Sequence, residues 1–236
     1  MRVAIFSDVH GNVRALEAVL ADMAGRADVA VCAGDVAWGG PFPERVIARL
    51  RQVGFACVVG NTDLTVVQDP APDLPWIRWA RSRLSDGDLA FLEHLPLQYR
   101  IEPPGSKDAL LVVHSTPDDP ARALPHYTQE EGLERLFGSA GAAVVVHGHD
   151  HWPSVAALHR VTVVGAGAVG LPFDGDPRAC YAVMTYDPPT GWHAEHRRVA
   201  YDVEAAAAEA EQAGMPGAQR WGVAIRRGLP PDRVTL

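Results

Sequence analysis

Short runs of β-branched and other apolar residues recur along much of the chain, and they restrict its fold more than any other feature. The runs cover residues 3–6, 29–33, 56–59, 110–113, 144–146 and 161–164. Uninterrupted apolar runs of this length are typical of strands buried on both faces. A helical pattern follows Asn12, a suitable helix cap, and another begins at Pro43 and stops before Gly54. The order strand, helix, strand, helix, strand predicts parallel strands joined by right-handed crossovers.

The middle of the chain has a different pattern. Pro70, Pro72 and Pro75 indicate a loop, and Ser85 is placed to cap an amphipathic helix after it. We therefore expect a helical insertion over about residues 69–104, within one domain that spans residues 1–236.

Three patterns predict the elements of the second half. Thr128 and Glu131 have the spacing of a capping box, which predicts a helix that ends near residue 137. Two runs, 181–186 and 193–199, are separated by a turn-like segment and predict an antiparallel hairpin. The tail, residues 202–236, is expected to be helical, with Asp202 as a cap.

Composition excludes several classes of function. A formal charge of −8 gives no broad attraction for nucleic-acid phosphates, so strong nucleic-acid binding is not expected. No apolar stretch approaches the roughly 20 residues that span a bilayer. Three cysteines, an odd number, are expected to be core residues and not a disulfide framework. The expected compartment is the cytoplasm, without membrane attachment.

Polar side chains follow five of the apolar runs, at the point where each predicted strand ends. In chain order they are Asp8 and His10, Asp35, Asn61 and Asp63, His114, and His149 and His151. Each alone could be a turn residue that bonds its own backbone. Because the carboxyl ends of parallel strands share one edge of a sheet, five such ends in succession favour a metal site.

The candidate ligands suit two cations better than one. Seven donors are too many for a single tetrahedral ion, but they suit two ions that share a carboxylate: Asp8, His10, Asp35, Asn61, His114, His149 and His151. Oxygen and imidazole donors without thiolate suit transition metals. We expect two divalent ions, manganese first, with Fe, Zn, Co or Ni as alternatives. A dinuclear site of this kind predicts phosphoester chemistry.

The order of these residues resembles the calcineurin-like metallophosphoesterase family over residues 1 to about 186. The motifs are Asp8-x-His10, Gly34-Asp35, Gly60-Asn61-x-Asp63, His114 and Gly148-His149-Asp150-His151. A further stretch, residues 170–181, is similar to a bacterial phosphodiesterase-like branch. The resemblance implies an α/β fold, a four-layer α/β/β/α sandwich of two mixed β-sheets flanked by helices.

The resemblance also implies roles for the ligands. Asp8, His10 and His151 would hold one metal, and Asn61, His114 and His149 the other, with Asp35 as the bridge. Asp35, Asn61, Asp63 and His114 are the residues expected to be catalytic. The implied reaction is hydrolysis of small phosphoesters, phosphodiesters above all, by a hydroxide bound at the dinuclear centre.

Two positions depart from the family pattern. Thr62 stands where the family usually has a histidine that can protonate the leaving group, and threonine cannot act as an acid near neutral pH. We therefore expect a preference for esters with good leaving groups. His126 is either a replacement acid or a solvated loop residue. Phe173 stands where a basic residue is frequent, which leaves an apolar surface for a base or aryl group, and Trp38 is either a pocket wall or a core residue.

Several alternatives stay open at this point. The same site could serve a dinucleoside polyphosphate hydrolase or a protein phosphatase. The chain could also be a catalytically silent metal-binding interaction protein. The expected partner is a small phosphoester substrate, and assembly into a homo-oligomer is left open.

Overall fold

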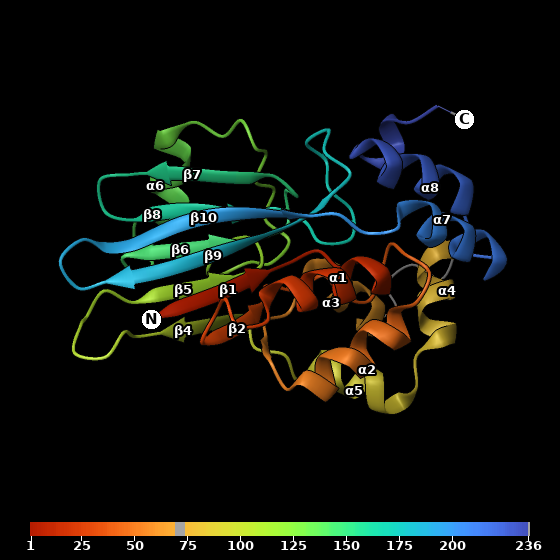
Figure 1. Cartoon of the computed structure of the whole chain (residues 1–236), viewed down its shortest axis with the longest axis horizontal. Helices are drawn as coiled ribbons and strands as arrows, with labels where there is room; N and C mark the ends of the chain where they lie inside the picture. Colours follow the sequence, from red (N-terminus) through yellow and green to blue (C-terminus); the bar gives the residue numbers. More distant parts are fainter. Residues whose placement is uncertain (69–73, 236) are drawn as a thin grey trace.

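Two five-stranded sheets form the centre of the structure, a computed structural model that describes residues 1–68 and 74–235 (Figure 1). The first sheet has the order β10-β9-β1-β2-β3, with β1 at Arg2–Phe6, β2 at Val29–Cys32, β3 at Ala56–Cys57, β9 at Ala179–Asp187 and β10 at Gly191–Val199. The second has the order β4-β5-β6-β8-β7, with β4 at Gln98–Ile101, β5 at Leu110–Val113, β6 at Val144–His147, β7 at Pro153–Ala157 and β8 at Thr162–Ala166.

Both sheets are mixed, and each contains three neighbouring strands that pair in parallel, β1, β2 and β3 in the first sheet and β5, β6 and β8 in the second. In the first sheet β1 pairs in parallel with β2 and antiparallel with β9. In the second, β5, β6 and β8 are parallel, and β4 and β7 pair antiparallel at its edges. The predicted hairpin is confirmed, because β9 and β10 pair antiparallel along their whole length.

Three buried layers hold the sheets and helices together. Between the sheets, Val3 and Ile5 of β1 pack with Val112 and Val146 of the second sheet. Residues of the other face of the first sheet pack against α1 (Val13–Met23) and α2 (Pro43–Val53), and α6 (Glu130–Phe137) covers the second sheet through Phe137. Full burial of one such apolar side chain contributes about 1.5–3 kcal/mol to the free energy of unfolding. The predicted four-layer sandwich is therefore confirmed.

The ends of several helices follow from their sequence. The side chain of Asn12 accepts the N–H of Ala15 at 3.2 Å and starts α1, and Gly54 adopts the left-handed conformation that ends α2. Asp202 accepts the N–H of Ala205 at 2.9 Å and starts α7 (Val203–Gln212), and α8 (Ala218–Arg227) follows it, as predicted. A short 3-10 helix, η1 (Pro231–Arg233), comes next.

The middle of the chain differs from the prediction in two ways. Pro75 begins a helix, α4 (Pro75–Arg83), and does not mark a loop, because proline suits the first helical turn. After α5 (Asp86–Glu93), which Ser85 caps as predicted, the expected helical insertion contains a strand, β4. Pro70 and Pro72 lie outside the described residues.

Two further predictions are wrong in detail. The capping box of Thr128 with Glu131 does not form, since Thr128 donates its hydroxyl hydrogen to the carbonyl of Pro125 at 2.6 Å and Gln129 is the N-cap of α6. The third strand ends at Cys57, and Asn61 begins an unpredicted helix, α3 (Asn61–Gln68). None of the described helices combines the length and apolar character that crossing a membrane requires.

Candidate metal centre

The loops that follow five strands carry the predicted ligands, and their backbone is strained. Among the described residues, the non-glycine positions with positive φ are Asp8, His10, Asp35, His149 and His151, with φ from 48° to 70°. All five are predicted ligands. Left-handed backbone at such residues costs of order 1–3 kcal/mol each, and strain of this kind gathers at functional sites.

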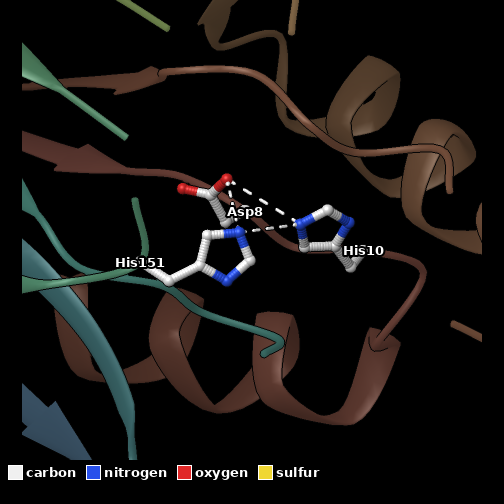
Figure 2. A group of neighbouring side chains, drawn as sticks. All are labelled: Asp8, His10 and His151. Atoms are coloured by element: carbon white, nitrogen blue, oxygen red, sulfur yellow. Dashed lines mark hydrogen bonds and ion pairs between the residues drawn. The ribbon is translucent and has the colours of Figure 1, made fainter. Parts of the chain in front are cut away.

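The first group of donors consists of Asp8, His10 and His151 (Figure 2). Nε2 of His10 lies 3.2 Å from Nε2 of His151, and Nε2 of His151 lies 3.3 Å from Oδ1 of Asp8. Oδ1 of Asp8 is 3.8 Å from Nε2 of His10. Three side chains from two distant segments thus point their donor atoms at one spot.

Backbone carbonyls fix which nitrogen of each ring faces that spot. Nδ1 of His10 donates to the carbonyl of Trp38, and Nδ1 of His151 donates to the carbonyl of Leu171. His114 does the same with Ala33 at 2.7 Å. A carbonyl oxygen can only accept, so the neutral rings carry their hydrogen on Nδ1 and present an Nε2 lone pair, which is the ligand form of histidine.

The second group consists of Asn61, His114 and His149. Oδ1 of Asn61 lies 2.9 Å from Nε2 of His114 and 2.9 Å from Nδ1 of His149. The rings of His114 and His149 meet edge to face, with centroids 5.2 Å apart. An oxygen and two ring nitrogens therefore converge on a second spot.

Asp35 lies between the two groups. Its Oδ2 is 3.7 Å from Nε2 of His10, and its Oδ1 is 3.4 Å from Nε2 of His114. The backbone N–H of Thr62 donates to Oδ1 at 2.9 Å and fixes the carboxylate plane. Each oxygen thus faces a different group, which is the arrangement a bridging carboxylate needs.

The buried carboxylates and histidines of the centre have strongly shifted pKa values. Burial opposes the ionisation of Asp8, but His151 outweighs it and holds the pKa of Asp8 at about 2. Burial would lower the pKa of His114, but the charge of Asp35 outweighs it and raises that pKa to about 10. Burial lowers the pKa of His149 to about 4, helped by repulsion from His114. In the absence of a cation, the raised pKa keeps His114 protonated beside the ionised Asp35. A divalent cation would take the place of that proton, as expected of a metal site built from carboxylates and imidazoles.

Asp63 does not reach this centre. Its carboxylate is fully buried and accepts four backbone N–H groups at 2.9–3.0 Å, from Asp35, Val36, Ala37 and Gly60. Those bonds join the loop after β2 to the loop after β3. These bonds give Asp63 a role in positioning the Asp35 loop, and a catalytic role for it stays a prediction.

Two glycines allow the loops to approach one another closely. A Cβ atom at Gly60 would lie 2.0 Å from Oδ1 of Asp35, and one at Gly148 would lie 1.9 Å from Oγ of Ser7. Real Cβ contacts are never this short, so a side chain at either position would displace a ligand loop. The loops therefore leave no room for a side chain at either position, which accounts for the glycine in both motifs.

A cavity of about 460 Å³ opens beside both donor groups. Thr62 lines it at the position of the missing family histidine, 4% exposed, and its Oγ1 has no partner among residues 1–68 and 74–235. The residues that the structure describes along this cavity do not include His126, whose ring stacks on Trp152 with centroids 4.1 Å apart. Trp38 does line it, so it is a wall of the cavity.

The structure brings all seven predicted ligands together, and it adds residues that the motifs did not indicate. The carbonyls of Trp38, Leu171 and Ala33 orient three of the rings, but a backbone carbonyl leaves no signal in a sequence. Trp79 and Trp221 line the far side of the cavity. An unusual count of six tryptophans is the only sequence signal that could have indicated an aromatic wall.

Comparisons with known proteins agree with this geometry. Residues 1–188 match the family model described as the calcineurin-like phosphoesterase superfamily domain. The crystal structure of a metallophosphoesterase from Sphaerobacter thermophilus is 28% identical, with a TM-score of 0.79 over 97% of this chain and 100% of that chain.

Two archaeal proteins are also similar. The crystal structure of the hypothetical protein PH1004 from Pyrococcus horikoshii has a TM-score of 0.83 over 96% of this chain and 98% of that one, at 16% identity, and so shows the shared fold. The uncharacterized protein MJ0912 from Methanocaldococcus jannaschii is 27% identical over 226 residues, which cover 86% of this chain and 89% of that protein.

Proposed function

This chain belongs to the calcineurin-like phosphoesterase superfamily, and we propose that it hydrolyses small phosphoesters, preferably phosphodiesters, at a centre that holds two divalent cations. The observation that carries the proposal is the position of Asp35. Its two oxygens face two separate groups of donors, 3.7 Å from His10 and 3.4 Å from His114. A single-ion site has no need of a carboxylate shared in this way.

Each of the two groups of converging donor atoms would hold one ion. Asp8, His10 and His151 would hold one ion, and Asn61, His114 and His149 the other, with Asp35 common to both. Manganese is the proposed metal, with Fe, Zn, Co or Ni as alternatives, since the donors are oxygen and imidazole nitrogen. When bound, two such ions lower the pKa of water and neutralise charge on a phosphoryl group.

The protein's own backbone and side chains orient the donor groups, and the ionised side chains set the local charge. The carbonyls of Trp38 and Leu171 keep the rings of His10 and His151 from turning, and Asp63 keeps the Asp35 loop in place. Two dications outweigh the charges of Asp8 and Asp35, so the site attracts phosphate although the chain carries −8 overall.

Thr62 narrows the range of substrates. It lines the cavity where an acid would protonate the leaving oxygen, and its hydroxyl does not give up a proton near neutral pH. Esters whose alcohol leaves without protonation are therefore the preferred substrates, as in aryl and nucleotide diesters. A phosphomonoester of a simple alkyl alcohol is expected to be a poor one.

The test combines metal analysis with a substrate panel. Protein stripped with a chelator is reloaded with Mn²⁺, its metal content is measured, and it is assayed on a bis-aryl phosphate, an aryl phosphomonoester, a dinucleoside tetraphosphate and a phosphopeptide. We expect about two ions per chain and the fastest turnover of the diester. One ion per chain would contradict the dinuclear centre.

Two other results would replace the proposal. Fastest turnover of the tetraphosphate or the phosphopeptide would assign the same site to a different substrate class. No turnover of any substrate at full metal content would indicate a silent metal-binding protein.

A further inference from the structure

The cavity beside the metal centre continues into a wall of aromatic residues. Trp38, Trp76, Trp79, Phe173 and Trp221 line it, together with the ligand side chains. They come from the loop after β2, from α4, from the segment before β9 and from α8. Figure 1 shows α4, α7 and α8 gathered at the end of the sandwich toward which β1 points.

The aromatic wall begins at a ligand. The ring of Phe173 stacks on the ring of His151 with centroids 4.0 Å apart and planes inclined by 10°. Phe173 also packs against the cluster that contains Trp221 and Leu171, and so does Trp79. The wall is therefore continuous from the metal ligands to α4 and the C-terminal helices.

This wall presents carbon to the cavity. The indole nitrogens of Trp38, Trp79 and Trp221 are buried and have no hydrogen-bond partner in the described part of the chain. What the rings expose is their carbon surface. Beyond the ligands, the charged residues along the cavity within the described part of the chain are Arg220 and Asp232, one of each sign. Such a wall favours a flat apolar group by stacking and offers little to a polyhydroxylated one.

Part of the cavity lining lies outside the residues that match the family model. The match to the family model ends at residue 188, and Met215 and Trp221 come after it. Trp221 is 3% exposed and belongs to the core of the C-terminal helices, where Leu171 and Trp79 also pack. The cavity is thus formed by this chain's tail and α4 closing over a site that the family shares.

We infer that this cavity binds an aromatic ring carried by the phosphoester, and that the ring selects the substrate by stacking on Phe173 and the tryptophans. The inference rests on the proposed function and names the substrate class for the same site. It applies equally to a nucleobase and to a simple aryl group, because both offer a π face to the wall. Small alkyl esters reach the metal centre without filling the cavity.

Binding of product-like phosphates tests the inference without turnover. The probes are phenyl phosphate, a nucleoside monophosphate, methyl phosphate and inorganic phosphate, titrated into Mn²⁺-loaded protein and followed by calorimetry. We expect the wild-type protein to bind both aromatic phosphates at least about tenfold more tightly than methyl phosphate, a difference of about 1.4 kcal/mol that stacking of one ring can supply.

Substitutions inside and outside the aromatic wall test whether these rings cause the preference for aromatic phosphates. Phe173→Ala and Trp76→Ala, the latter at a position 43% exposed and so tolerant of truncation, are each expected to reduce the ratio of aromatic to inorganic phosphate affinity about three- to tenfold. Tyr127→Ala removes an aromatic side chain that is 69% exposed and outside the cavity lining, and it should leave the ratio unchanged.

The outcomes separate this inference from the proposed function. Turnover of diesters with equal affinity for phenyl and methyl phosphate overturns the aromatic pocket and leaves the phosphoesterase in place. Selective binding of the aromatic phosphates without turnover of any ester supports the pocket and overturns the proposed activity. If both aromatic phosphates bind more tightly than methyl phosphate, the pocket is supported. Which of the two binds more tightly then shows whether the pocket prefers a nucleobase or an aryl group.

Discussion

Nε2 of His10 lies 3.2 Å from Nε2 of His151, although 141 residues separate the two histidines. Both Nδ1 atoms donate to backbone carbonyls, so two neutral rings would point lone pairs at each other. Both residues also have left-handed backbone. A cation or a shared proton between the nitrogens would remove the repulsion between the two lone pairs, as expected of a metal site.

The bridging position of Asp35 predicts the effect of neutralising it. Asp35→Asn keeps the shape of the side chain and removes the charge that both ions would share. We expect metal content to fall from about two ions per chain to one or fewer, and diester turnover to fall by more than the roughly 10–100-fold typical of groups that only support a ligand. Elemental analysis and a diester assay measure the two effects. Asp86→Asn, an exposed carboxylate on α5, is the control, and equal metal content in both variants would contradict the bridge.

The space around Gly60 predicts that even a methyl group is disruptive there. In Gly60→Ala the new Cβ would lie 2.0 Å from Oδ1 of Asp35, so the loop must shift. We expect the free energy of unfolding to fall by about 1–3 kcal/mol, which lowers the melting temperature by about 2–12 °C, and we expect metal binding to weaken. Thermal unfolding of the metal-free and metal-loaded protein measures both.

Gly87→Ala provides the matched control for that variant. A Cβ at Gly87, in α5, would have its nearest neighbour, Oγ of Ser85, at 3.7 Å. Alanine is the better helix former, so this variant should be neutral or more stable by up to about 1 kcal/mol. If Gly60→Ala were as stable as Gly87→Ala, the close packing of the two ligand loops would not be essential.

The position of Thr62 predicts a gain of activity. Thr62→His places an imidazole in the cavity where an acid can reach the leaving oxygen, and general acid catalysis contributes about 10²–10⁴-fold. We expect turnover of phenyl phosphomonoesters to rise about tenfold or more, with a smaller rise for p-nitrophenyl esters, whose alcohol needs no proton. Thr62→Asn, similar in shape but without an acidic proton, is the control. A uniform change across leaving groups would count against this role.

Asp22 predicts how stability depends on pH away from the metal centre. Its carboxylate joins α1 to the hairpin, accepting from Nε of Arg197 at 2.8 Å and from the hydroxyl of Tyr181 at 2.7 Å, with Arg26 at 3.4 Å. The hydrogen bond from Arg197 lowers the pKa of Asp22, and burial opposes that shift only partly. A lowered folded-state pKa adds stability above the unfolded value of about 3.9, and this is lost as pH falls through the folded value.

Asp22→Asn should therefore be less stable than the wild-type protein at pH 7, by roughly 1 kcal/mol, and the gap should close below about pH 4. Urea unfolding of the metal-free proteins at several pH values measures the gap. A gap that widened in acid would mean that Asp22 is protonated in the folded protein.

Strands buried on both faces could be predicted from the sequence, whereas two exposed strands at the edges of the second sheet could not. The residues of β5 are all buried and form an unbroken apolar run, whereas β4 and β7, at the edges of the second sheet, are mostly exposed. An edge strand in the sequence Gln98–Ile101 lacks both an apolar run and a clear alternation, so its pairing with β5 is visible only in three dimensions.

The sequence by itself indicated the candidate ligands and the edge of the sheet where they meet, because strand ends and turn chemistry depend on a few neighbouring residues. Only the tertiary structure decided which oxygen of Asp35 faces which histidine, that Asp63 bonds the backbone of the Asp35 loop, and that Trp79 and Trp221 line one cavity. Those relationships depend on packing between residues far apart in the chain. Because packing of apolar surfaces is not directional, the spacing of residues along the sequence does not predict which of them will meet.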